Sequence, residues 1–530
     1  MLILQKAFYL HPNKDVLFED IDFTVNKQDK IALAGNNGSG KSTLLRIIAG
    51  ELSLSGGVMQ RFEQPYFVPQ LYGQFDHLSI AQALGVANKL NALQEILAGK
   101  TTAENFTALD DDWSIEERCK EALHYWQLDT IDLSQKMGSL SGGEKTKVFL
   151  AGIIVHQPAF ILLDEPSNHL DRNSRQLLYD LIEKTTSTLL VVSHDKKLLG
   201  LLHTIAELDK NGITIYGGNY SFYAAQKELQ AKTLEEDIHS KEKEIRKAKE
   251  KERETKERQQ RMDARGKGKQ EKAGMARIMM NTYRNKAENS TAKLKGVHAE
   301  KIGNLSGELQ ALRSSVIDPA KMKMGLDKPA LQHRKLLFKA GALNIAFTGN
   351  RIWKDDLDFE IHAGERIAIK GNNGSGKTSL LQIICGNRQP QKGTVYHADT
   401  SSFYIDQDYS LLHDQLTVYE QVQLYNENGL AEYEVKSRLN RFLFGKESWG
   451  KKVAALSGGE RMRLLLSALT ILPQSPVILF LDEPTNNLDI QNTAILAAAI
   501  HAYEGTVIVV SHDDHFLEEI RIEREINLER

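Results

Sequence analysis

The sequence predicts an α/β protein with two tandem P-loop domains, joined by a long antiparallel α-helical linker. Three observations support this fold class. A glycine-rich phosphate-binding loop occurs twice in the 530 residues, further motifs follow each copy in the same order, and a highly charged region separates the two copies. Strands that alternate with helical patterns in both copies favour a largely parallel sheet.

The first phosphate-binding loop follows an apolar run at 31–34 and precedes a helical pattern that begins at Leu44. Strand, glycine-rich loop and helix form the context that a P-loop requires. The glycines let successive N–H groups turn toward phosphates, and the helix start adds a positive dipole end. Lys41 supplies a charge for the β- and γ-phosphates of ATP, and Ser42 supplies an oxygen for Mg²⁺. The loop reads Gly35, Asn36, Asn37, Gly38, Ser39, Gly40, Lys41, Ser42 and Thr43.

The same loop returns in the second half of the chain, where Lys377 and Thr378 take the two chemical positions. Its residues are Gly371, Asn372, Asn373, Gly374, Ser375, Gly376, Lys377, Thr378 and Ser379. A match of this length in this context, found twice, predicts two nucleotide sites.

Composition restricts the environment in which the chain works. The net charge of −3 indicates no particular partner, and two cysteines exclude a disulfide framework and fit a reducing cytoplasm. The first residues read as a strand at 2–4 and not as a signal peptide. The longest apolar runs, such as 477–481, fall far short of the ~20 residues that a membrane helix needs. We therefore expect a cytoplasmic protein without membrane association.

The spacing of the later motifs indicates an internal duplication. Lys41 and Lys377 are 336 positions apart, whereas the carboxylates Asp164 and Asp482 are 318 apart, as are two histidines at 194 and 512. Between the isolated glutamine (Gln70 or Gln407) and the signature Leu-Ser-Gly-Gly-Glu, the first copy carries about 21 extra residues, mostly near 83–118. A short helical protrusion and a longer surface loop are equally compatible with this insertion.

The region between the copies differs in composition from both of them. Residues 227–257 hold ten basic and ten acidic side chains, which supports a solvated helix, and residues 258–301 hold twelve basic and four acidic ones. A heptad stripe follows. We predict two antiparallel helices with a basic connection near Arg265–Arg284, interrupted by glycines at 266, 268 and 274. The stripe consists of Ile302, Leu305, Leu309, Leu312 and Val316. The predicted domains are 1–225, 226–335 and 336–530.

Several polar residues have the chemistry of phosphate hydrolysis. Asp164 and Asp482 end apolar strands and are placed to hold Mg²⁺, directly or through water. Glu165 and Glu483 follow them and are placed to orient or deprotonate the attacking water. Further candidates are His194 and His512, for the γ-phosphate or that water, and Gln70 and Gln407, for Mg²⁺ and the water. A lone glutamine is usually only polar surface, and these two are distinguished by their position between motifs.

The two Leu-Ser-Gly-Gly-Glu signatures begin at Leu140 and Leu456, and each precedes a helical pattern. Serine and glycines at a helix start form an anion site, although a single copy would more often be an ordinary helix cap. Two copies, in order with the P-loop, Asp-Glu and His, closely resemble the ATP-binding cassette (ABC) ATPases over roughly 400 residues. The resemblance implies that the chain hydrolyses ATP with Mg²⁺.

The resemblance further implies composite sites, in which the P-loop of one copy faces the signature of the other. Lys41 would then share one ATP with Ser457 and Gly459, and Lys377 would share the other with Ser141 and Gly143. It also implies an aromatic ring on the adenine ahead of each P-loop. Phe347 fits in the second copy, whereas Tyr9 and Phe8 are the candidates in the first, where extra residues at 11–13 alter the spacing.

Within that superfamily the chain resembles the F subfamily (ABC-F), which has two cassettes in one chain, no membrane span and a charged helical linker. The segment 165–171 is close to a motif typical of that group, with Ser167 where threonine is usual. The resemblance implies a monomer whose cassettes close on each other, and binding to the ribosome. The linker would contact large-subunit rRNA and tRNA near the P site and the peptidyl-transferase centre. Some members confer resistance to antibiotics that act on the large subunit.

Two other functions are compatible with the same motifs. The chain could be the ATPase subunit of an ABC exporter, but a basic helical hairpin has no evident use there. It could instead be a DNA-acting or DNA-repair ATPase, in which the basic linker meets a different nucleic acid. Concentrated Lys and Arg favour sequence-independent contact with phosphates, and no aromatic pattern indicates that bases are read.

Overall fold

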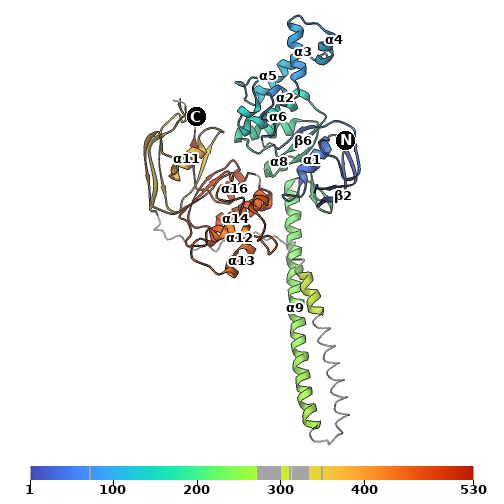
Figure 1. Cartoon of the computed structure of the whole chain (residues 1–530), viewed down its shortest axis with the longest axis vertical. Helices are drawn as coiled ribbons and strands as arrows, with labels where there is room; N and C mark the ends of the chain where they lie inside the picture. The colour runs from blue at the N-terminus through green and yellow to red at the C-terminus, as the bar shows by residue number, and fades with distance from the viewer. Residues whose placement is uncertain are drawn as a thin grey trace. The chain divides into compact units, whose positions relative to one another are not determined.

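The computed structural model describes residues 2–12, 14–70, 73–270, 300–309, 312, 334–347, 350–486 and 488–528, without the side chains of 259–260, 263–270, 347 and 350. The chain divides into two compact units (Figure 1). One unit contains Met1–Ser221 and Pro319–Arg530, and the other is Phe222–Asp318. The first unit holds both P-loop domains, and we refer to the second as the linker unit.

The first P-loop domain is organised around a six-stranded sheet whose strands are parallel except for the last pair. Strands β6 and β7 are buried at every residue, because helices cover both faces of a parallel sheet. In sheet order the strands are β5 (Tyr66–Val68), β6 (Phe160–Asp164), β7 (Thr188–Val192), β3 (Lys30–Ala34), β8 (Thr204–Asp209) and β9 (Gly212–Gly217). A separate antiparallel sheet has the order β2 (Val16–Val25), β1 (Leu2–Leu10) and β4 (Gly56–Arg61).

The helices of this domain begin with α1 (Lys41–Ala49), which starts at the P-loop lysine. The insertion expected near 83–118 is helical, since α3 and α4 lie within it and extend from the rest of the domain (Figure 1). The helical protrusion is thus the correct interpretation of the insertion. The remaining bounds are α2 (Ile80–Ala83), α3 (Ala87–Leu97), α4 (Ala103–Leu109), α5 (Ile115–Tyr125), α6 (Gly142–His156), α7 (Arg172–Lys184) and α8 (Lys196–Gly200).

The second P-loop domain repeats this plan with a five-stranded parallel sheet, which confirms the duplicated α/β fold. Its order is β16 (Ser402–Ile405), β17 (Ile478–Asp482), β18 (Thr506–Val510), β14 (Arg366–Gly371) and β19 (Arg524–Leu528). Beside it lie β13 (Leu357–His362), β10 (Leu336–Asn344) and β15 (Lys392–His397), and the hairpin β11 (Ala346–Phe347) and β12 (Asn350–Arg351). Its helices are α11 (Lys377–Ile384), α12 (Val418–Gln423), α13 (Glu432–Arg441), α14 (Gly458–Ile471), α15 (Ile490–Ala502) and α16 (Asp514–Glu519).

The linker unit contains one long helix, α9 (Tyr220–Gln270), which begins before the expected boundary at 226. This helix continues through Gly266 and Gly268, where the sequence predicted an interruption. Glycine costs only about 1 kcal/mol inside a helix, so two glycines weaken a helix of this length without ending it. At 1.5 Å per residue the helix is roughly 75 Å long. The rest of the basic connection (271–299), including Gly274, lies outside the described residues.

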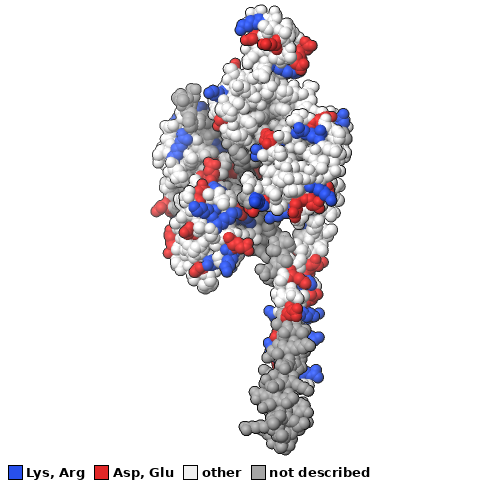
Figure 2. Space-filling model, turned by 45° about the vertical axis from the view of Figure 1, so that its right-hand side comes forward, with Lys and Arg blue, Asp and Glu red and all other residues white. Residues whose placement is uncertain are grey.

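A second helical segment at 300–309 returns along α9, and Lys241 Nζ lies 2.8 Å from Glu308 Oε2. Ile302, Leu305, Leu309 and Leu312 of the predicted stripe are all half-buried, whereas Val316 lies outside the described residues. On α9 the half-buried positions include Leu234, Ile238, Lys241, Ile245, Ala248, Glu252 and Thr255, at alternating spacings of four and three. Basic and acidic side chains mix on the described surface of α9 (Figure 2). The charge balance of residues 227–257 predicted a solvated helix and did not indicate this half-buried stripe.

Candidate active site

Both P-loops hold their lysine in the same way. Lys41 is 7% exposed, and its Nζ donates to the carbonyl oxygens of Gly35 (2.8 Å) and Asn36 (3.1 Å). Lys377 is 9% exposed and donates to Gly371 (2.9 Å) and Asn372 (3.1 Å). Burial lowers the pKa of both amino groups. Each loop therefore holds a buried lysine amino group, which two carbonyl oxygens fix in place and which can also bind an anion.

The glycines and serines of the first loop fit a phosphate chain. Gly40 has φ +97°, and a Cβ there would lie 2.9 Å from atoms of Leu17 and Phe18, so only glycine is accommodated. At Gly38, by contrast, a Cβ would meet nothing within 4 Å. Among the residues that the structure describes, the buried Oγ atoms of Ser39 and of its counterpart Ser375 have no hydrogen-bond partner. Buried polar atoms normally have partners, so these hydroxyls together with the lysines suit the oxygens of a triphosphate.

A pair of hard oxygen ligands stands beside each loop, as magnesium prefers. Ser42 Oγ donates to Asp164 Oδ1 at 3.1 Å, and Thr378 makes the equivalent hydrogen bond to Asp482. Burial raises the pKa of Asp164 to about 6, so this carboxylate is poorly solvated and gains from a nearby cation. Asp482 also accepts from the Tyr404 hydroxyl at 3.1 Å, whereas strand register places Phe67 at the equivalent position.

The glutamates after these aspartates stand in a strained conformation. Glu165 has φ +49° and Glu483 has φ +47°. Both values lie in the left-handed region, which residues other than glycine rarely adopt. Each backbone N–H is held by a strand carbonyl, Glu165 by Val192 and Glu483 by Val510, at 2.8 Å. Matching strain at matching positions in both domains indicates a functional placement.

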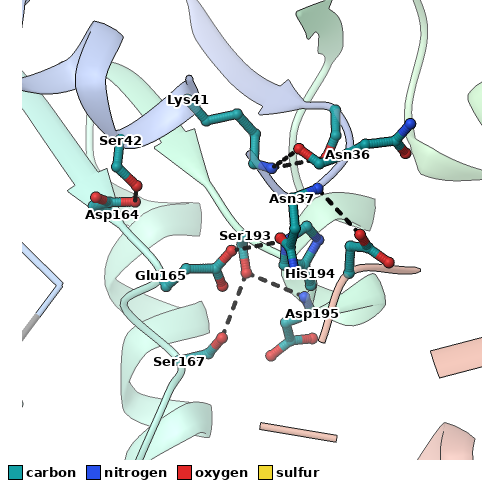
Figure 3. Close-up of polar contacts among 12 residues, drawn as sticks. Asn36, Asn37, Lys41, Ser42, Asp164, Glu165, Ser167, Ser193, His194 and Asp195 are labelled. Atoms are coloured by element: carbon teal, nitrogen blue, oxygen red, sulfur yellow. Dashed lines mark hydrogen bonds and ion pairs between the residues drawn. The ribbon is translucent and has the colours of Figure 1, made fainter. Parts of the chain in front are cut away.

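Each glutamate faces the candidate histidine of its own domain. Glu165 points toward His194 (Figure 3), with 3.3 Å between Oε1 and Nε2, and the distance between Glu483 and His512 is 3.4 Å. Burial raises the pKa of Glu165 and raises that of Glu483 to about 7. Burial lowers the pKa of His194 and lowers that of His512 to about 3. The imidazoles are therefore neutral at physiological pH, each with one donor and one acceptor nitrogen.

Two cavities contain the P-loops, and each is lined by both P-loop domains. The first, of about 380 Å³, is lined by Asn37, Gly38, Gly40, Lys41, Ser42 and Thr43 of the first P-loop, by Gln70, Glu165 and His194, and by Ser457 and Gly458 of the second domain. The second, of about 700 Å³, is lined by Asn373, Gly374, Gly376, Lys377, Thr378, Ser379, Gln407, Asp482, Glu483 and His512, and by Ser141, Gly142 and Gly143 of the first domain. Each P-loop thus shares a cavity with the signature of the other domain.

The signature serines are helix caps as well as cavity residues. Ser141 accepts from the Glu144 N–H at the start of α6, and Ser457 accepts from the Glu460 N–H at the start of α14. Gly143 approaches the opposite P-loop closely, since a Cβ there would lie 2.7 Å from Asn373 Nδ2. The N-terminus of each signature helix therefore faces the cavity, and the hydroxyl of the capping serine lies at that N-terminus.

Two aspartates connect the domains reciprocally. Asp489 caps α15 with Oδ1 and accepts from the Asn37 N–H with Oδ2 at 3.1 Å. Asp171 caps α7 in the same manner and accepts from the Asn373 N–H at 3.4 Å. Neither aspartate was predicted as a site residue, although each ends a segment that begins Glu-Pro-Ser/Thr-Asn.

Phe8 and Tyr9, the two rings predicted to stack on adenine in the first domain, are not among the residues that line the first cavity. The ring of Tyr9 packs against Phe18, and a Cβ at Gly56 would lie 2.1 Å from the ring of Phe8. Both aromatic rings are used in packing. His11, one of the extra residues that alter the spacing, lines this cavity. Phe347 lies in β11, and its side chain is outside the described set.

Some predicted residues lie behind the cavity surfaces. Asp164 is reached through Ser42, and Gly459 packs on the Asn492 side chain. Further predicted residues that do not line their cavity are Gly35, Asn36, Ser39, Gly371, Asn372 and Ser375. Gln127 and Arg175 line the second cavity and were not predicted, because no motif contains them and only the docking of the two domains brings them there.

The fold and the two shared cavities define a tandem P-loop ATPase of the ATP-binding cassette type. A family model described as "ABC transporter" matches residues 18–168 and 354–486, more than half of the chain. This chain belongs to the ABC family, and within it to the F subfamily, and it is an ATP-hydrolysing enzyme. In the described residues, no helix has the length and apolar character to cross a bilayer.

Similar proteins match nearly the whole chain. The energy-dependent translational throttle protein EttA of Haemophilus influenzae is 30% identical over 543 residues, covering 96% of this chain and 88% of that protein. ATP-binding protein Uup of Escherichia coli K12 is 29% identical, covering 98% and 79%. Among solved structures, archaeal ribosome recycling factor aABCE1, in complex with stalk protein aP1, matches with a TM-score of 0.60 at 20% identity, covering 98% of this chain and 87% of that one. This last likeness concerns the fold.

The close approach of Gly143 to the opposite domain gives a testable prediction. Gly143→Ala should reduce nucleotide binding at the second cavity by about tenfold or more, since the new methyl group displaces Asn373 or the His169 carbonyl. Gly142→Ala should have the milder effect, because its Cβ would meet His169 no closer than 3.5 Å. Equilibrium titration with a fluorescent ATP analogue checks this order, and equal effects of the two variants would contradict it.

Proposed function

We propose that this chain is a cytoplasmic ribosome-binding ATPase that acts on translation, with its two P-loop domains closing on two ATP molecules within a monomer. The observation that carries the ATPase part is the sharing of each cavity by a P-loop and the opposite signature. The ribosomal part is supported by the similarity to EttA, which is named a translational throttle protein, and by the charged linker unit between the domains.

The proposal assigns a role to each of the motif residues at the two cavities. The P-loop N–H groups and Lys41 or Lys377 bind the phosphates, and the opposite Ser457 or Ser141 contacts the γ-phosphate from the far side. Ser42 and Asp164, or Thr378 and Asp482, hold Mg²⁺ with Gln70 or Gln407. ATP and Mg²⁺ supply the bond to be cleaved and the cation that neutralises its charge.

The buried glutamates act on water in this proposal. Glu165 and Glu483 orient the attacking water and accept its proton, a task that their raised pKa values favour. His194 and His512 are neutral, lie 3.3–3.4 Å from these carboxylates and contact the γ-phosphate or that water. His11, which lines the first cavity, takes the adenine there in place of Tyr9.

A double substitution tests the catalytic assignment. In Glu165→Gln/Glu483→Gln, ATP should still bind, while turnover should fall by about 100-fold or more, because the amide cannot accept the proton. Phosphate release measures turnover, and the exposed Glu104→Gln on α4 is the matched control. The same double variant should co-sediment with ribosomes in ATP more strongly than the wild type. Wild-type turnover in the double variant would refute the assignment, whereas co-fractionation with membranes would favour an exporter subunit.

The proposed contact between the linker and large-subunit rRNA or tRNA, near the P site and the peptidyl-transferase centre, predicts salt-dependent binding. Neutralising seven basic residues should weaken ribosome association at low salt and flatten its dependence on salt, because each lost phosphate contact lowers the slope by about one. Nucleotide affinity should remain unchanged. The residues are Arg261, Arg265, Lys267, Lys269, Lys272, Arg277 and Arg284.

Co-sedimentation across a salt series measures this, with neutralisation of Lys89, Lys100 and Lys120 in the first domain as a control for lost surface charge. An unchanged affinity and slope would make the linker a spacer. Preferential binding of duplex DNA over ribosomes would favour the DNA-acting alternative. Protection against antibiotics that act on the large subunit is the most specific form of the proposal, and growth assays with such antibiotics test it.

A further inference from the structure

Among the differences between the two P-loop domains beside their shared cavities is the residue at position 175 and its counterpart at 493. Arg175 lies four residues after Asp171 in α7, and Thr493 lies four residues after Asp489 in α15. The backbone N–H of each donates to the carbonyl of its aspartate at 2.9 Å, so the two residues occupy the same place in their helices. A long cation in one domain therefore corresponds to a short hydroxyl in the other.

The arginine reaches across to the second domain. Its Nε donates to the Leu170 carbonyl of its own domain at 3.1 Å, and its Nη1 donates to the His512 carbonyl of the other domain at 3.3 Å. The side chain is half-buried and lines the second cavity together with Lys377, Glu483 and His512. Thr493 does not line the first cavity and is too short for the equivalent bridge.

Arg175 contacts His512, the residue that faces Glu483, the candidate general base. The His512 imidazole lies 3.4 Å from Glu483, so a guanidinium fixed on the His512 carbonyl restrains the backbone that carries this ring. Burial has the largest effect on the pKa values of Glu483 and His512, and the charge of Arg175 acts on both of them as well, which agrees with its nearness to the pair. The Nε hydrogen bond to Leu170 keeps the planar guanidinium in one orientation toward the His512 carbonyl.

We infer that Arg175 is a positioning residue that the first P-loop domain supplies to the ATP site of the second. It holds the loop of His512, and thereby the orientation of that ring against Glu483, only when the two domains are docked. Hydrolysis at the second site is consequently tied to docking through a contact that the first site lacks, which makes the two sites inequivalent. The inference rests on the proposed roles of Glu483 and His512.

Single-site backgrounds isolate the effect. With Glu165→Gln, only the second site turns over, and adding Arg175→Ala should lower kcat about tenfold or more while KM for ATP changes less than about threefold. Arg175→Lys should recover part of the loss. With Glu483→Gln, only the first site turns over, and Arg175→Ala should change its kcat less than about twofold. Steady-state phosphate release measures all of these values.

Two controls match the arginine. Thr493→Ala in the Glu483→Gln background tests the equivalent position and should leave first-site turnover unchanged. Arg172→Ala removes another contact between the domains, since Arg172 lies 3.5 Å from Asp514, but Arg172 does not line the cavity and its loss should have little effect. Equal losses in both single-site backgrounds, no loss in the Glu165→Gln background, or a loss that Arg172→Ala reproduces would overturn the inference.

A spectroscopic measurement is independent of turnover. In histidine-labelled protein without nucleotide, Arg175→Ala should shift the His512 imidazole resonance, assigned with His512→Asn, and leave His194 in place. An unmoved His512 signal would also overturn the inference. Failure of the proposed catalytic roles would look different, since the two single glutamine variants would then retain full turnover at both sites.

Discussion

The active arrangement depends on two aspartates that each serve both P-loop domains. Asp171 and Asp489 cap a helix of their own domain with one carboxylate oxygen and accept a P-loop N–H of the other domain with the second. Because the same carboxylate sets a helix start and an inter-domain contact, the docking of the domains and the local geometry of each site are linked. The shared cavities follow from this constraint, since it brings each signature helix to the opposite P-loop.

Burial then determines the chemistry inside the cavities. Burial favours the neutral forms of the ionisable side chains. It lowers the pKa values of the lysines and histidines and raises those of the aspartates and glutamates. Backbone strain at Glu165 and Glu483 occurs in the same places, as do the hydroxyls of Ser39 and Ser375, which have no hydrogen-bond partner in the described part of the chain. These costs are tolerated where a phosphate chain and a cation would offset them, and they mark the site without a bound ligand.

The sequence predicted the parts of the site that local chain geometry determines. P-loops, Asp-Glu strand ends and signature helices are each short segments whose function depends on their own backbone, so motif and spacing were sufficient. It did not predict that His11 lines the first cavity, because this residue belongs to the insertion ahead of the first P-loop and matches no motif. It did not predict Arg175 either, because this residue matters only through a contact with a loop more than 300 residues away. The predicted interruption at Gly266 and Gly268 was wrong for another reason: α9 continues through both glycines, because helix propensity is a weak constraint in a long helix.

The central claim is that each ATP site is built from both P-loop domains, and the occupancy of the two sites in a signature variant tests it most directly. Ser457→Arg places a bulky cation in the first cavity, next to Lys41 and far from Lys377 in the second. Photolabelling with 8-azido-ATP, followed by peptide mapping, should show loss of label around the first P-loop and normal label around the second. Loss of label around Lys377 alone, with the first P-loop still labelled, would show that each signature serves its own domain and would contradict the account.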